Sequence, residues 1–222
     1  MAPYGLKHLD SQWRDFGTMQ AFGRTLADLR LIAKYNTLDF YFLELPSFSP
    51  VIEKATALPN LTVREIRSQE WQHLRFEEGL ATPEWIEQQF AQNSRLFLAL
   101  DGDTVLMNWI NTKFADLKHI GRPKVALPEG TAYAYRAVTA PAYRNQGIGT
   151  FLKQSILKQI QPEGHQIVFL TVFLKDIRPH RWHQANHFKK WGRVTYINLR
   201  IKQLWWIRLT KEGRRCPELF HA

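Results

Sequence analysis

AVTAPAYRNQGIGTFLKQSIL, residues 137–157, is the stretch of this chain that decides its fold. It continues an aromatic run, TAYAYRAV (131–138), which is typical of a strand. A turn with two glycines, QGIGT (146–150), follows. Apolar residues then recur at helical spacing at Ile148, Phe151, Leu152, Ile156 and Ile160. The face between them carries Lys153, Gln154 and Lys158, so we expect these three side chains to face solvent.

The turn has the chemistry of an anion site. A helix N-terminus leaves about four backbone N–H groups without partners, and the helix dipole adds roughly half a positive charge there. Glycines let a phosphate approach the backbone, and Arg144 can add a charge-assisted contact. The spacing fits neither a Walker loop nor a dinucleotide fingerprint, whose third glycine is missing. Taken alone, the turn fits an ordinary strand-to-helix connection equally well.

The longer string resembles the acyl-CoA-binding motif of the GNAT acyltransferase superfamily, in which R/Q-x-x-G-x-G/A opens a helix after a Pro-aromatic turn. The resemblance extends over residues 61–210 and leaves the first sixty residues outside. It implies an α/β (α+β) GNAT fold with a central mixed, mostly antiparallel sheet flanked by helices. It also implies acyl-CoA as the donor substrate, either acetyl-CoA or a longer chain.

The resemblance assigns roles to individual residues. It implies that the pyrophosphate binds at Arg144, Asn145, Gln146, Gly147, Ile148, Gly149 and Thr150. Ala137 and Val138 would offer backbone groups to the pantetheine and the thioester carbonyl, where an N–H stabilises the oxyanion. The strand 131–138 would splay from the next one, QIVFLTVFL (166–174). The acceptor amine attacks directly, so no Ser or Cys nucleophile is required.

The second half departs from the family pattern of Asn, Ala and Tyr before a Gly-aromatic pair. Counting back from Gly192 puts Phe188 in the place of the Tyr that commonly protonates the leaving thiolate. Tyr135 and Tyr133 are alternative proton carriers. A helix predicted over 179–191 would place three histidines on one stripe, and these are candidate bases: His180, His183 and His187. We predict no metal site, because three ligands from one helix lack a carboxylate or Cys beside them.

The rest of the chain suggests an N-terminal extension (1–60) and a GNAT domain (61–222). Within the extension we predict a helix over 10–35, a short strand DFYFLEL (39–45) and a linker. Further predicted elements are a strand at 61–66, helices starting at 68 and at Thr82-Pro83, a hairpin around 101–103, a loop at 113–130, and two closing strands, VTYINLRI and LWWIRLT.

Charge and composition restrict the partners. The net charge is +10, and residues 175–215, with twelve basic and two acidic side chains, carry the whole excess. Such a basic protein attracts anions, for example an acidic peptide or an acyl carrier protein. Without a recognisable nucleic-acid module, nucleic acid is not an expected partner, and membrane contact is expected to be peripheral at most. A single Cys and the absence of a signal-peptide pattern predict a cytoplasmic protein.

Two functions follow from these observations. The first is an N-acyltransferase that moves an acyl group, possibly of medium or long chain, to a primary amine on a small molecule, an amino sugar or a peptide. The second is a non-catalytic GNAT-fold module that binds acyl-CoA or an anionic partner. The replacement of the usual Tyr by Phe188 favours the second.

Overall fold

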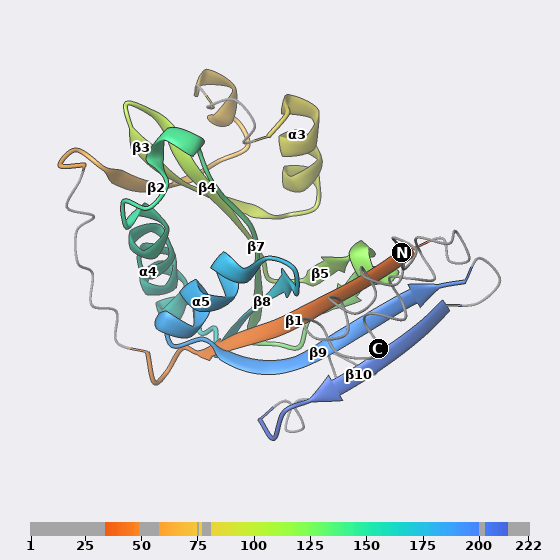
Figure 1. Ribbon diagram of the computed structural model, residues 1–222. Coiled ribbons are helices and arrows are strands. Elements are labelled where there is room, and N and C mark those ends of the chain that lie inside the picture. The colour runs from red at the N-terminus through yellow and green to blue at the C-terminus, as the bar shows by residue number, and fades with distance from the viewer. Residues whose placement is uncertain (1–33, 49–57, 75, 77–80, 200–202, 213–222) are drawn as a thin grey trace, which may run out of the picture.

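The computed structural model describes residues 34–48, 58–74, 76, 81–199 and 203–212. Eight strands form one sheet in the order β10-β9-β1-β8-β7-β4-β3-β2 (Figure 1). The pair β7–β8 is parallel and the other neighbouring pairs are antiparallel. The strands are β1 (Lys34–Glu44), β2 (Thr62–Ile66), β3 (Arg95–Asp101), β4 (Asp103–Asn111), β7 (Thr131–Thr139), β8 (Ile167–Phe173), β9 (Lys189–Asn198) and β10 (Gln203–Leu209). The predicted mixed, mostly antiparallel sheet is confirmed.

The described segments contain three α-helices, namely α3 (Pro83–Ala91), α4 (Ile148–Ile160) and α5 (Ile177–Ala185). Short 3-10 turns lie at Trp71–His73, Lys118–Ile120, Pro141–Tyr143 and Gln161–Glu163. The predicted start of α3 is confirmed, because Thr82 caps the helix by accepting the N–H of Trp85 at 3.4 Å. No helix in these described segments is long and apolar enough to cross a membrane.

The strand predicted over 39–45 is β1, and it lies inside the sheet between β8 and β9. Leu38 pairs with Phe173 on one side and with Val194 on the other. This part of the predicted extension is therefore integral to the fold. The helix predicted over 10–35 falls almost entirely outside the described residues, so the helical appendage stays a prediction.

Two predicted elements are corrected by the structure. The expected loop at 113–130 contains a hairpin of β5 (Phe114–Leu117) and β6 (Arg122–Ala126), whose Leu117 and Val125 are buried in the core. The helix expected over 179–191 is α5, which ends at Ala185. The chain then enters β9. Its side chains Trp191 and Val194 pack in the core cluster under the β5–β6 hairpin, so this stretch is stabilised as a strand and not as a helix.

The sheet separates two layers of core. On one face, α4 packs its Ile148, Leu152 and Ile156 against residues of β3, β4, β7 and β8. On the other face, α3 covers a cluster around Trp109, and the β5–β6 hairpin covers a cluster around Phe40 and Trp191. Figure 1 shows α4 and α5 beside one another, away from α3. The sequence stretch 137–157 thus supplies a strand of the sheet and the helix that covers it.

Gly192 lies inside β9, where the neighbouring strand β10 comes very close. A Cβ added here would lie 2.9 Å from Leu209 Cδ2 and 3.0 Å from the carbonyl oxygen of Arg208. We expect Gly192→Ala to lower the free energy of unfolding by about 2 kcal/mol, because the two strands must move apart. Urea unfolding measures this. Gly149→Ala is the control, because φ there is not left-handed and the added Cβ would lie no closer than 3.9 Å to its nearest neighbour, Leu106 Cδ1. An equal loss there would contradict the explanation.

Candidate functional site

The turn before α4 is built from residues in the left-handed conformation. Asn145 has a φ of 63°, and Gly147, the N-cap of α4, has a φ of 78°. Gln146 Nε2 donates a hydrogen bond to the carbonyl oxygen of Ala142 at 3.0 Å, which holds the turn closed. Turns of this kind direct successive N–H groups to one side, and such concavities bind anions.

Among the described residues, the first turn of α4 contains two bonded and two unbonded backbone N–H groups. The N–H groups of Thr150 and Phe151 bond to the carbonyl of Gly147, at 3.0 and 3.1 Å, whereas those of Ile148 and Gly149 have no backbone acceptor in the described part of the chain. The exposed Arg144 stands directly before the turn, and its Nε donates to the end of β7 at 3.2 Å. The predicted pyrophosphate residues therefore lie in sequence at the start of the helix, although the side chain of Ile148 is buried in the core. Their role in binding stays a prediction.

The strands β7 and β8 pair over only three positions. Their pairing ends at Tyr133 with Phe169, although both strands continue for several residues. Beyond this point β7 carries a bulge against β4, and Arg136 takes a φ of 52°. A bulge bends its strand and increases the local twist. Ala137 and Val138 are the residues predicted to meet the thioester. Ala137 lies in the bulge next to Arg136, and Val138 resumes the pairing opposite Met107.

The helix α5 is tied to the same turn. Trp182 Nε1 donates a hydrogen bond to Thr150 Oγ1 at 2.9 Å, so α5 is bonded to the first turn of α4. His183 follows Trp182 and is 8% exposed. Its ring lies among Trp182, Tyr41 and Phe188, with centroid distances of 4.7, 5.8 and 5.4 Å. The structure therefore places the predicted base His183 next to a residue that is bonded to α4, and its catalytic role stays a prediction.

The position where α5 ends suggests a different alignment with the family pattern, in which the glycine falls at His187 and not at Gly192. The chain leaves the helix through His187, whose φ of 64° is the left-handed conformation that usually falls to glycine at a helix C-terminus. Gly192, in contrast, lies within a strand. If His187 takes the place of the family glycine, then Phe188 is the aromatic residue after it. His183, four residues earlier, then occupies the position expected for the Tyr.

The charge state of His183 follows from its surroundings. Burial, then the charges of Lys153 and His180, lower the pKa of His183 to about 3. Its Nδ1 is buried without a hydrogen-bond partner among the described residues. His183 is therefore neutral near pH 7 and a weaker base than an exposed histidine. The exposed His187 lies past the helix, so the predicted stripe of three histidines does not form on α5.

The third predicted catalytic residue, Tyr135, points towards α3. Its hydroxyl is hydrogen-bonded to Gln89 Oε1 at 2.9 Å and to Ser94 Oγ at 2.7 Å. Burial is the main cause that raises the pKa of Tyr135 above its ordinary value. Tyr133 stacks on it at 5.3 Å and has a pKa raised to about 12, again chiefly by burial. Both phenols therefore keep their protons more tightly than a solvated tyrosine does.

Sequence reasoning missed a buried polar pair next to the bulge. Lys153, expected on the solvent face of α4, is 4% exposed, and its Nζ donates to Asn108 Oδ1 at 2.7 Å. The amide of Asn108 donates in turn to the carbonyl of Tyr135 at 2.8 Å. The sequence does contain an indication of this burial, because Lys153 lies three residues before Ile156 and four before Leu157, both apolar. Its position on the helix thus belongs to the buried stripe.

Two positively charged side chains of the basic segment 175–215 are paired with a buried carboxylate of β1. Asp39 of β1 is buried and accepts hydrogen bonds from Lys190 at 2.6 Å and from Arg193 at 2.6 and 3.0 Å. Burial pushes the pKa of Asp39 upwards, but these two bonds and charges outweigh it and lower the pKa. Next to Asp39, His180 Nε2 donates to the carbonyl of Phe173 at 3.0 Å, and its Nδ1 accepts from the Tyr41 hydroxyl at 2.9 Å. These contacts fix α5 to β1.

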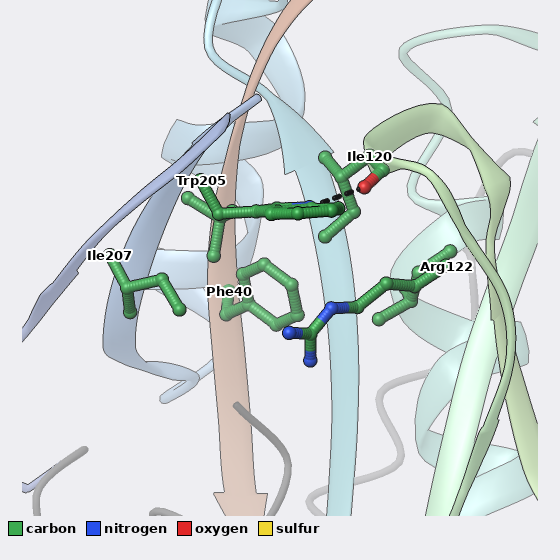
Figure 2. A pocket seen from close by; sticks show the side chains of 7 residues that line it. Phe40, Ile120, Arg122, Trp205 and Ile207 are labelled. Carbon is green, nitrogen blue, oxygen red and sulfur yellow. Dashed lines mark hydrogen bonds between the residues drawn. The ribbon is translucent and has the colours of Figure 1, made fainter. Parts of the chain in front are cut away.

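A small apolar pocket lies elsewhere, between β10 and the β5–β6 hairpin. Figure 2 shows Trp205 above Phe40, with the guanidinium of Arg122 at the side. Trp205 Nε1 donates to the carbonyl of Ile120 at 2.7 Å. None of the residues of the turn before α4 lines this pocket. It therefore belongs to the packing of the hairpin on the sheet.

Comparison with protein families gives one match. The model described as the acetyltransferase (GNAT) family matches residues 60–188, more than half of the chain. This region begins just before β2 and ends at Phe188, so it contains β7, the turn, α4 and α5. No curated protein sequence matches the chain.

Solved structures with a similar fold have low sequence identity. A GCN5-related N-acetyltransferase from Sphaerobacter thermophilus is 15% identical, with a TM-score of 0.52, over 80% of this chain and 55% of that one. A fungal multi-domain β-N-acetylglucosaminidase that contains a GCN5-related glucosamine N-acetyltransferase region is 13% identical, with a TM-score of 0.55. The match covers 82% of this chain and 23% of that one. A Drosophila protein is 12% identical, with a TM-score of 0.50, over 85% of this chain and 56% of that one. The chain therefore spans less than two thirds of each of these proteins, and the likeness is one of fold.

Proposed function

Because the chain belongs to the GNAT acetyltransferase family, we propose that it transfers an acyl group from acyl-CoA to a primary amine. One observation supports this most directly. The turn at residues 144–149 connects β7 to α4, and β7 stops pairing with β8 at Tyr133, before either strand ends. We therefore expect the diphosphate at the turn and the pantetheine arm along the unpaired part of β7. The diphosphate would bind the N–H groups of the turn and Arg144. The arm would run from there between the separating strands.

Acetyl-CoA is the donor that the family implies, and we propose that the acyl group is short. Tyr133 and Tyr135 stack on the face of β7 directed at α3, next to the bulge. An acyl chain that passed between the strands would meet these rings. A medium or long chain would need them to move, so longer donors are expected to bind less tightly.

The acceptor is proposed to be a primary amine that attacks the thioester carbonyl directly. The N–H groups of Ala137, within the bulge, and of Val138, the next residue, are the proposed donors to the oxyanion. An amino sugar belongs among the first acceptors to test, together with small amines and peptides, because a fungal protein of similar fold contains a glucosamine N-acetyltransferase region. An acidic peptide or an acyl carrier protein remains a predicted partner of the basic segment 175–215.

The alternative, a non-catalytic module that binds acyl-CoA, is favoured by one observation. His183 is neutral and Tyr135 holds its proton tightly, so neither of these predicted catalytic groups is tuned for proton transfer near pH 7.

We expect the full chain to release free CoA from acetyl-CoA when a suitable primary amine is added. A thiol reagent would follow CoA release across a panel of amino sugars, polyamines and peptides, with acetyl-CoA alone as the blank. In parallel, thermal unfolding would be recorded with acetyl-, hexanoyl- and palmitoyl-CoA. Stabilisation without amine-dependent CoA release would favour the binding module. Stabilisation by palmitoyl-CoA alone would overturn the short acyl group.

A further inference from the structure

The amino group of Lys153 is the buried titratable group that the proposed function leaves without a role. An ammonium group has three N–H donors, and within the described residues only Asn108 accepts one of them. Burying a charge without a partner is costly, and here no carboxylate of the described chain bonds to Nζ. A lysine in such a place is suited to exchanging its proton with a ligand that arrives beside it.

The position of Lys153 is fixed relative to the bulge of β7. Its Nζ lies 2.7 Å from Asn108 Oδ1, and Asn108 Nδ2 lies 2.8 Å from the carbonyl oxygen of Tyr135. That carbonyl directly precedes Arg136, the left-handed residue of the bulge. Two hydrogen bonds therefore connect the amino group to the backbone on which the thioester carbonyl is proposed to bind.

On the opposite side, α5 presents His183 to the same place. Trp182, the residue before His183, donates a hydrogen bond to Thr150, which lies three residues before Lys153 on α4. The charge of Lys153 also contributes to the lowered pKa of His183. If His187 takes the place of the family glycine, His183 stands at the position of the proton donor, and it is neutral near pH 7. The proton of this buried pair therefore resides on Lys153, the residue from the helix that follows the pyrophosphate turn.

We propose that Lys153 is the general acid that protonates the departing CoA thiolate. This inference rests on the proposed acyl transfer. When the amine nitrogen attacks, a C–N bond forms and the carbonyl oxygen becomes an oxyanion. Collapse of this intermediate breaks the C–S bond, and sulfur keeps the electron pair. Lys153 Nζ then gives a proton to sulfur, and the proton lost by the attacking nitrogen returns to Lys153 through solvent.

The proton balance fits the surroundings of Lys153. Burial lowers the pKa of Lys153 to about 7, whereas an alkyl thiol has an ordinary pKa of about 8.5, so transfer to the thiolate is downhill. Asn108 from β4 is hydrogen-bonded to Lys153, and His183 from α5 is close enough to have its pKa lowered by the charge of Lys153. Behind His183 stand His180 and, on β1, the phenol of Tyr41 and the ion-paired Asp39. None of these is a free carboxylate that would hold the proton back.

The test compares Lys153→Met with Lys158→Met, which removes an exposed lysine of the same helix. With acetyl-CoA and the best amine of the panel, we expect Lys153→Met to lower kcat by about 100-fold, with KM for acetyl-CoA changed by less than about 3-fold. The wild-type kcat should fall as pH rises above the Lys153 pKa, because the acid is then deprotonated. This high-pH decrease should disappear in Lys153→Met and persist in Lys158→Met.

Lys153→Arg distinguishes proton transfer from positioning. An arginine keeps the charge and can bond to Asn108, but it does not release its proton at these pH values. If Lys153→Arg is as slow as Lys153→Met, proton transfer is supported. If Lys153→Arg restores kcat, or if Lys153→Met keeps both kcat and the high-pH decrease, the proposal is wrong. A wild-type protein that binds acetyl-CoA but releases no CoA with any amine would overturn the acyl transfer, and the role of Lys153 with it.

Discussion

Gly147→Asp is expected to weaken the binding of acetyl-CoA by at least about 100-fold. The left-handed φ of 78° at this position tolerates aspartate better than most side chains, so the turn should keep its shape. The new carboxylate would then stand at the N-cap of α4, next to the N–H groups proposed to hold the diphosphate. Juxtaposed like charges cost several kcal/mol, and each 1.4 kcal/mol is a factor of ten in affinity. Isothermal titration calorimetry with acetyl-CoA measures the change.

Gly164→Asp is the matched control. Gly164 follows α4 at its other end, has a φ of 89°, and an added Cβ would meet nothing within 4 Å. The same residue is thereby introduced in a similar backbone conformation but away from the turn. We expect its acetyl-CoA affinity to equal that of the wild type within about 2-fold. Equal weakening in both variants would mean that Gly147 does not belong to the diphosphate site.

The second large effect is expected at Asp39. Asp39→Asn leaves Lys190 and Arg193 without their buried carboxylate, and breaking such an ion pair typically costs 3–5 kcal/mol. Both cationic side chains are about a third exposed, so water offsets part of the cost. We expect the free energy of unfolding at pH 7 to fall by about 3 kcal/mol, as measured by urea titration. Since these contacts join β1 to β9, the loss should affect the whole sheet.

Glu44→Gln provides the comparison on the same two strands. Glu44 pairs with Lys189 at 3.3 Å, but both side chains are more than half exposed. An exposed pair contributes little, so we expect less than about 0.5 kcal/mol. If the two variants lose equal stability, burial is not what makes the Asp39 contacts strong.

The pH dependence of this effect has a definite sign. The pKa of Asp39 is lower in the folded protein than in the unfolded chain, so the carboxylate stabilises the fold above its ordinary pKa of about 3.9. That stability disappears as pH falls through the lower, folded pKa. The difference between wild type and Asp39→Asn should therefore be constant above about pH 5 and shrink below about pH 4. A difference that grows in acid would contradict the lowered pKa.

The sequence predicts those elements whose structure depends mainly on residues close together in the chain. The turn and α4 are encoded in consecutive residues, as is the hairpin at Asp101-Gly102-Asp103, where Gly102 has a φ of 79°. The hairpin at 113–130 was missed because its prolines and glycines obscure short strands. Those strands are stabilised by distant partners such as Phe40 and Tyr196, not by their own propensity.

The candidate site was only half predictable for a similar reason. The anion-binding turn follows from spacing, but Lys153 was assigned to solvent because a lysine is rarely buried. Its burial arises from α5 and β4, which meet it only in the folded chain. The end of α5 was misplaced because Gly192 resembles a helix stop. A glycine is needed at position 192 because β10 comes very close there in the folded protein, and no local pattern reveals this contact.

The central place of β1 has a consequence for how the chain folds. During synthesis β1 emerges first, but its partners β8 and β9 follow only from residues 167 and 189 onwards. Contacts between residues so far apart in sequence slow folding, and β1 must wait with both edges unpaired, a state prone to association. A shortened chain that began at residue 60 would lack this strand altogether. It would leave β8 and β9 as open edges, and we expect it to aggregate during expression.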